Sequence, residues 1–98
     1  MFRHVVLLRW KDGIGAAAHD AVVEGLRALP GLIPELRDYV VGTDLRLNDA
    51  NAHLAVVADF DDEAGYVVYR DHTEHRKVIE ERITPIVDQR TAVQFTLP

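Results

Sequence analysis

Two residues suited to acid–base chemistry lie close together in the second half of the sequence, Tyr69 and His75. A histidine that titrates near neutral pH can remove a proton from the carbon next to a carbonyl group. A tyrosine hydroxyl can donate a hydrogen bond to the oxygen on which enolate charge then develops. The pair indicates enolate chemistry. A second interpretation stays open, in which His75 only bonds the backbone at a helix start and Tyr69 belongs to the core.

The spacing of the pair matters, because residues six apart on an unbroken helix point about 120° away from each other. Asp71 and Glu74 have the spacing of a capping box, which is typical of a helix start. We therefore predict that one helix ends near Arg70 and that a second helical segment, capped by Asp71, begins there. Such a break lets Tyr69 and His75 face one cleft.

A metal site is the other chemistry that this segment suggests, through His72, Glu74 and His75. Two histidines three residues apart can share a helix face, but the HExxH signature is absent and no third ligand is evident. Cysteine is absent from the chain, which excludes thiolate metal sites and thiol nucleophiles. We predict neither a metal nor a cofactor.

These side chains need a scaffold, and the hydrophobic pattern predicts four strands and two helical regions. The strands are expected at residues 4–10, 36–44, 53–60 and 91–97. The helical regions are expected at residues 16–29, which carry an apolar stripe, and at residues 62–86, with the break at Asp71 and a kink or end at Pro85.

The resulting order, βαββαβ, is typical of a ferredoxin-like α+β fold. In that fold the sheet is antiparallel, the strand order is 4-1-3-2, and both helices cover one face. Strands 4–10 and 53–60 carry apolar residues at both odd and even positions, so the second face must be buried as well. We predict that a second copy of the chain covers it in a homodimeric α+β barrel. If His4 and His53 face the helices, the residues expected on the dimer side are Val5, Leu7, Leu54 and Val56.

Length and charge narrow the class of protein. The 98 residues predict one domain, 1–98. Sixteen acidic residues against 11 Lys and Arg give a net charge of −5, which argues against nucleic acid or an anionic membrane as a partner. The uncharged stretches are too short to span a membrane. We therefore expect a compact cytoplasmic protein.

Several short segments, in their order and spacing, resemble the stress-responsive A/B barrel (Dabb) family over essentially the whole chain. The segments are HVVLL (4–8) before KDG (11–13), LIP (32–34) before YVVG (39–42), FD (60–61) and YRDHTEH (69–75). The last is similar to the family's Tyr-x-x-His-Pro-x-His, with Thr73 in place of the proline. The resemblance implies the dimeric α+β barrel expected above.

The resemblance also implies a site. In a plant polyketide cyclase of this family, a His and a Tyr near the second helix and histidines on the sheet surround the substrate. We predict catalytic roles for His75, Tyr69 and His4, and substrate contacts for His53, Leu26 and His72. Since the strands that start at His4 and His53 run antiparallel, only one of the two is expected to reach His75, and His4 is favoured.

Two functions follow as alternatives. The first is a small-molecule pocket that binds or cyclises a carbonyl, polyketide-like substrate by His/Tyr acid–base chemistry. The second is a non-catalytic, stress-related dimeric barrel. Leu26 stands where the plant cyclase has a Tyr, which predicts a more apolar wall. Gln94 stands where many members carry Asp, which predicts that His75 has no carboxylate to orient it.

Overall fold

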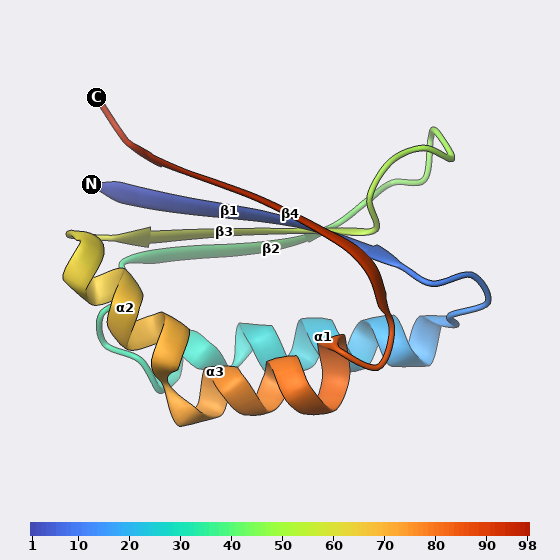
Figure 1. The fold of residues 1–98 in the computed structure, drawn as a ribbon, viewed down its shortest axis with the longest axis horizontal. Helices are drawn as coiled ribbons and strands as arrows, with labels where there is room; N and C mark the ends of the chain where they lie inside the picture. Colours follow the sequence, from blue (N-terminus) through green and yellow to red (C-terminus); the bar gives the residue numbers. More distant parts are fainter.

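A computed structural model describes all residues, 1–98. The strands are β1 (Phe2–Trp10), β2 (Asp38–Thr43), β3 (Leu54–Phe60) and β4 (Val87–Thr96). The helices are α1 (Ala16–Arg27), α2 (Glu63–Asp71) and α3 (Thr73–Val78), with a 3₁₀ turn at Leu29–Gly31 and a π-helical turn at Ile79–Ile83. All strand pairs are antiparallel and the sheet order is β2-β3-β1-β4, which confirms the predicted ferredoxin-like fold. Figure 1 shows the helices together on one face of the sheet.

The sheet has one buried and one open face, set by the alternation of side chains along β1. Val6, Leu8 and Trp10 face the helices and belong to the core cluster. Directly opposite residues of an antiparallel pair share a face, and β3 places Val56 opposite Val6. The helices cover the even-numbered residues of both strands.

This register corrects the predicted dimer side of β3. Leu54 and Val56 are only 1% and 4% exposed and lie in the core, so their placement on the dimer side is wrong. The reason is the register: Leu54 lies opposite Leu8 and Val56 opposite Val6, and both of these β1 residues face the helices. Val5 and Leu7 do lie on the open face, as the alternation of β1 requires.

The helix break is present, but its cap differs from the prediction. α2 ends at Asp71 and α3 begins at Thr73, with His72 extended between them at φ −62° and ψ 135°. The His72 Nδ1 accepts the backbone N–H of Glu74 at 3.1 Å. Asp71 belongs to the last turn of α2 and pairs with Arg70 instead. The capping residue is therefore His72 and not Asp71.

The last strand begins earlier than predicted. The prediction missed its first residues because they are mostly polar. β4 starts at Val87 opposite Trp10 and runs beside all of β1, ending with Thr96 opposite Phe2. Asp88, Gln89 and Arg90 are exposed at this sheet edge, so no apolar pattern marks them as strand.

No layer of this chain covers the open face of the sheet (Figure 1). The large apolar side chains exposed there are Leu7 (42%), Val40 (53%), Val93 (57%) and Phe95 (44%). Two further leucines, Leu45 and Leu47, stand exposed in the loop between β2 and β3. None of the helices has the length and hydropathy that a membrane span requires.

Candidate functional site

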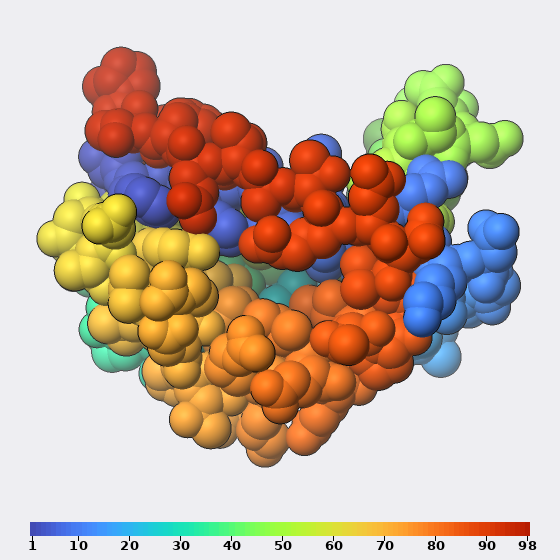
Figure 2. Space-filling model, in the orientation of Figure 1, coloured from blue at the N-terminus to red at the C-terminus, as the bar shows by residue number.

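A cavity of about 300 Å³ lies between the covered face of the sheet and the helices. It opens in the hollow that Figure 2 shows between β4, in red, and the helical segment of α3 and the π-helical turn, in orange. Its apolar wall is formed by Val6, Leu8, Leu26, Val56, Ile79 and Ile83. Its polar side chains are His4, Tyr66, Tyr69, Arg70, His75, Arg76 and Arg90.

His75 stands in the cavity with one ring nitrogen free. The break at His72 turns the chain so that the His75 ring stacks on Tyr69, with ring centroids 4.0 Å apart. Its Nδ1 lies 3.2 Å from the carbonyl oxygen of Arg70. A carbonyl only accepts, so Nδ1–H donates and the neutral ring carries its lone pair on Nε2. A backbone carbonyl, and not a carboxylate, orients this ring.

Burial is the main cause that lowers the pKa of His75, and it outweighs the hydrogen bonds to backbone that raise it. The ring is therefore neutral at neutral pH. A neutral imidazole with a free Nε2 in an apolar cavity has the form that a general base needs.

His4 has the opposite arrangement. Its Nδ1 lies 2.9 Å from the side-chain amide nitrogen of Gln94 on the neighbouring strand. The amide nitrogen donates, so the proton of the neutral His4 ring sits on Nε2, which is then a donor. Burial, followed by the charges of Arg90 and His75, lowers the pKa of His4 to about 4. His4 thus stays neutral above mildly acidic pH.

Tyr69 is buried and shares a hydrogen bond with Tyr39, their hydroxyl oxygens 3.0 Å apart. Burial raises the pKa of Tyr69 to about 12, and it raises the pKa of Tyr39 as well. Both hydroxyls therefore keep their protons at neutral pH. When Tyr39 donates to Tyr69, the Tyr69 proton is free to reach a ligand.

The structure brings together four of the six predicted site residues and separates the other two. His75, Tyr69, His4 and Leu26 all line the cavity. His72 is outside its lining and caps α3. His53 lies at the opposite end of β1 from His4, where its Nδ1 accepts the backbone N–H of Trp10 at 3.0 Å. Substrate contacts in this cavity are therefore not expected from His53 or His72.

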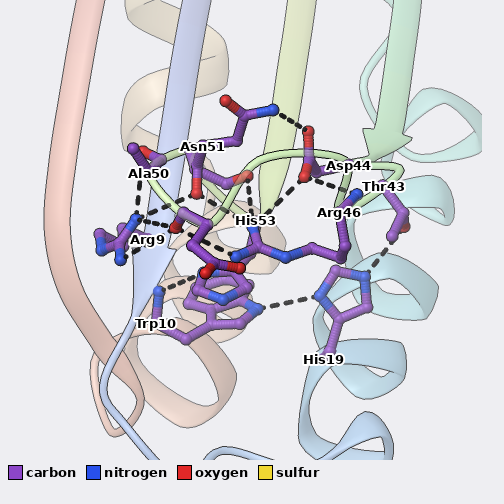
Figure 3. A network of polar contacts seen from close by, with 11 residues as sticks. Arg9, Trp10, His19, Thr43, Asp44, Arg46, Ala50, Asn51 and His53 are labelled. Atoms are coloured by element: carbon purple, nitrogen blue, oxygen red, sulfur yellow. Dashed lines mark hydrogen bonds and ion pairs between the residues drawn. The ribbon is translucent and has the colours of Figure 1, made fainter.

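A polar network at that far end holds the loop between β2 and β3 (Figure 3). The Trp10 indole N–H donates to His19 Nδ1 at 2.9 Å, and His19 Nε2 lies 2.9 Å from the Thr43 hydroxyl. Arg9 and Arg46 bind backbone carbonyls of the loop, both reaching that of Asn51 at 3.0 Å. His53 belongs to this structural network. The chain holds no group of three or more His, Cys, Asp or Glu side chains arranged for a metal ion.

Several residues of the site were not predicted from the sequence, among them Tyr39 and Arg90. Tyr39 looks like an ordinary core residue of β2, and Arg90 looks like an ordinary polar residue of an edge strand. Gln94 was expected to matter for His75, but its side chain bonds His4 instead. The roles of Gln94 and Arg90 depend on the pairing of β4 with β1, which places Gln94 opposite His4 and Arg90 opposite Leu8. The role of Tyr39 depends on its contact with Tyr69 of α2. The alternation of β4 against Leu8 and His4 could have placed Arg90 and Gln94 on the helix side, had the strand been predicted to start early enough.

The fold and cavity define a small ferredoxin-like protein with a His/Tyr-lined pocket. The model of the family described as "Stress responsive A/B Barrel Domain" (Dabb) matches residues 2–97, so the chain belongs to the Dabb family. No protein with a curated description matches its sequence.

Solved structures agree with this assignment. A dimeric ferredoxin-like protein of unknown function from Thermobifida fusca YX is 43% identical, with a TM-score of 0.89 over 98% of this chain and 90% of that one. A dimeric protein of unknown function from Bacteroides fragilis is 21% identical (TM-score 0.88; 98% and 95% covered). A hydroxynitrile lyase from Passiflora edulis is 20% identical (TM-score 0.81; 99% and 96% covered), which shows a common fold.

Proposed function

We propose that the cavity binds a small carbonyl compound and that His75 removes a proton from the carbon next to the carbonyl group. The observation that carries this proposal is that one cavity contains both a free histidine acceptor and a free histidine donor. His75 offers a free Nε2 lone pair, while His4 offers an Nε2–H on the facing sheet. The wall between them is apolar, which strengthens electrostatic interactions with a bound oxygen.

In this mechanism the substrate carbonyl oxygen accepts hydrogen bonds from His4 and Tyr69. The C–H proton moves to Nε2 of His75, and the C–H electron pair becomes the enolate stabilised by the two donors. The enolate carbon then attacks a second carbonyl of the same substrate and closes a ring. The proton held by His75 moves to the new alkoxide, so His75 returns to its neutral form. A polyketide-like chain with carbonyls at alternate carbons fits this sequence of steps.

The Passiflora edulis protein of the same fold is a hydroxynitrile lyase. This similarity supports the proposal in one respect: a protein with this fold can be an enzyme of the lyase class. The test is exchange of the α-protons of 4-phenyl-2-butanone for deuterium in D₂O, followed by proton NMR. We expect His75→Ala to slow enzyme-dependent exchange by on the order of 10²-fold or more, the usual size of general base catalysis.

His19→Gln is the matched control, because His19 belongs to the network around Trp10 and does not line the cavity. It should leave the exchange rate unchanged. The proposal fails if the wild-type protein accelerates α-proton exchange neither in this ketone nor in a β-keto acid (a diketide). The chain would then be the non-catalytic, stress-related dimeric barrel.

Self-association belongs to the same proposal. Relatives of this fold are described as dimeric, the Thermobifida fusca protein among them. The apolar residues on the open sheet face support a homodimer through that face. A cytoplasmic location, and the lack of nucleic-acid and membrane partners, stay predictions that depend on the net charge of −5 and the composition.

A further inference from the structure

The charged residues that line the cavity are all arginines, although the chain as a whole is acidic. Arg70, Arg76 and Arg90 are solvent-exposed members of the lining, which places them on the open side of the cavity, its mouth. No Asp or Glu is among the lining residues. The chain has 16 acidic residues against 11 Lys and Arg, so this local excess runs against its composition. A cavity mouth with positive charge favours an anionic ligand.

Two of the three arginines already have an acidic partner. Arg70 Nε lies 2.9 Å from Asp71, and Arg76 lies 3.5 Å from Glu80. Arg90 has neither an ion pair nor a side-chain hydrogen bond within the chain. The mouth therefore presents one uncompensated guanidinium group.

The position of Arg90 directs this group toward the reacting residues. Arg90 pairs with Leu8 across the strands, so its side chain shares the helix-facing side of the sheet with Leu8 and His4. Its charge helps to lower the pKa of His4 and opposes the burial that raises the pKa of Tyr69, which places the guanidinium within electrostatic reach of both.

We propose that Arg90 binds the carboxylate of the ligand, so that the cavity takes a small carboxylic acid with an apolar body. A guanidinium group binds a carboxylate through two parallel hydrogen bonds. One free positive charge suits a monoanion, and a volume of about 300 Å³ suits a compact ligand of the size of a phenylpropanoic acid. The apolar body would lie against Val6, Leu8 and Leu26.

For the reaction, this inference rests on the proposed function. A carboxylate fixed at Arg90 leaves the rest of the ligand extended toward His4 and His75, so a keto group further along the ligand could meet the donor and the base. The substrate class would then be keto acids with an apolar chain or ring. As a statement about binding alone, the inference can be tested without any turnover.

The probes are 3-phenylpropanoate and its neutral isostere 3-phenylpropanamide, titrated into the protein by calorimetry at low salt. We expect the carboxylate to bind at least tenfold more tightly than the amide, since hydrogen bonds between two charged groups are stronger than those to a neutral group. Arg90→Gln should remove that preference and leave amide binding unchanged. Arg90→Lys should restore part of it, because a point charge replaces the planar fork.

Arg37→Gln is the control, since it removes the same charge from an exposed arginine that is paired with Asp61 outside the cavity. It should change neither affinity. Equal binding of acid and amide by the wild-type protein, or an unchanged preference in Arg90→Gln, would overturn the inference. So would the absence of binding by either probe at millimolar concentration.

The two proposals fail in different ways. If His75→Ala abolishes proton exchange in the neutral ketone while Arg90→Gln leaves the carboxylate preference intact, the proposed function stands and the role of Arg90 does not. If the carboxylate binds through Arg90 while no substrate exchanges its protons, the chain is a binding protein for small acids and the enzymatic proposal is wrong.

Discussion

At the scale of single residues, the two histidines of the cavity differ in one hydrogen bond. Nδ1 donates to a carbonyl in His75 and accepts from an amide in His4, so one ring presents an acceptor and the other a donor. The same residue type thus serves two roles, and the choice is made by the hydrogen-bond partner of Nδ1, the Arg70 carbonyl or the Gln94 amide.

The pH dependence of proton exchange should follow His75. Its pKa lies below the ordinary histidine value, mainly because the ring is buried. The active form is the neutral one, so activity should be constant at neutral pH and fall as the pH drops through this lowered pKa. A pH–rate profile whose acidic limb lies at or above pH 6.5 would contradict the assignment of His75 as the base.

The pH dependence of the free energy of unfolding should reflect the lowered pKa of His4. Its pKa is about 4 in the folded chain and near 6.5 when unfolded, so between these values the unfolded state binds more protons. His4 therefore destabilises the fold as the pH falls from 6.5 to 4, by up to about 1.4 kcal/mol per pH unit. Urea unfolding at several pH values should show a shallower acid loss in His4→Gln. If the free energy of unfolding falls equally steeply with pH in wild type and variant, the lowered pKa of His4 is contradicted.

At the scale of elements, the break between α2 and α3 positions the base. Without the extended residue His72, Tyr69 and His75 would diverge around one helix. The predicted cap, Asp71, lies one residue before the observed cap, His72. The pattern located the break, but the identity of the cap depends on where α2 ends, and α2 includes Asp71.

Substitutions at the break should separate the two candidate caps. His72→Ala removes the acceptor of the Glu74 N–H and should lower the free energy of unfolding by roughly 1 kcal/mol. It should also slow proton exchange by displacing His75. Asp71→Ala removes only an exposed ion pair and should lower the free energy of unfolding less than His72→Ala does. Thermal unfolding of both variants tests this, and a larger loss in Asp71→Ala would mean that Asp71 is the cap after all.

The elements also show where sequence patterns are sufficient. The continuous apolar runs of β1 and β3 predicted the two strands, because burial in a sheet leaves that signature. The strand order was predicted from the βαββαβ succession of elements. The phase of β3 could not be predicted from the run itself, since alternating apolar residues look alike on both faces. It follows from the register with β1, which places Leu54 opposite Leu8 and Val56 opposite Val6. The polar start of β4, with Arg90, depends in the same way on its partner strand.

At the scale of the whole molecule, the open sheet face is the feature that one chain leaves incomplete. Light scattering at micromolar concentration should give twice the 11.0 kDa of a single chain. Leu7→Asp places a charge in the centre of the open face and should produce monomers. Val68→Asp on α2 is the matched control, being similarly exposed but on the helix side, and should stay dimeric. A wild-type mass of one chain would refute the dimer.

The single tryptophan of the chain gives the far end of the molecule its own optical signal. The Trp10 indole is buried, bonds His19 and stacks on His53, and it does not line the cavity. Intrinsic fluorescence should therefore stay constant while a ligand fills the cavity. It should change when the loop between β2 and β3 rearranges or the chain unfolds. Calorimetry and fluorescence thus observe opposite ends of the same sheet, and a ligand that alters both would reveal communication between them.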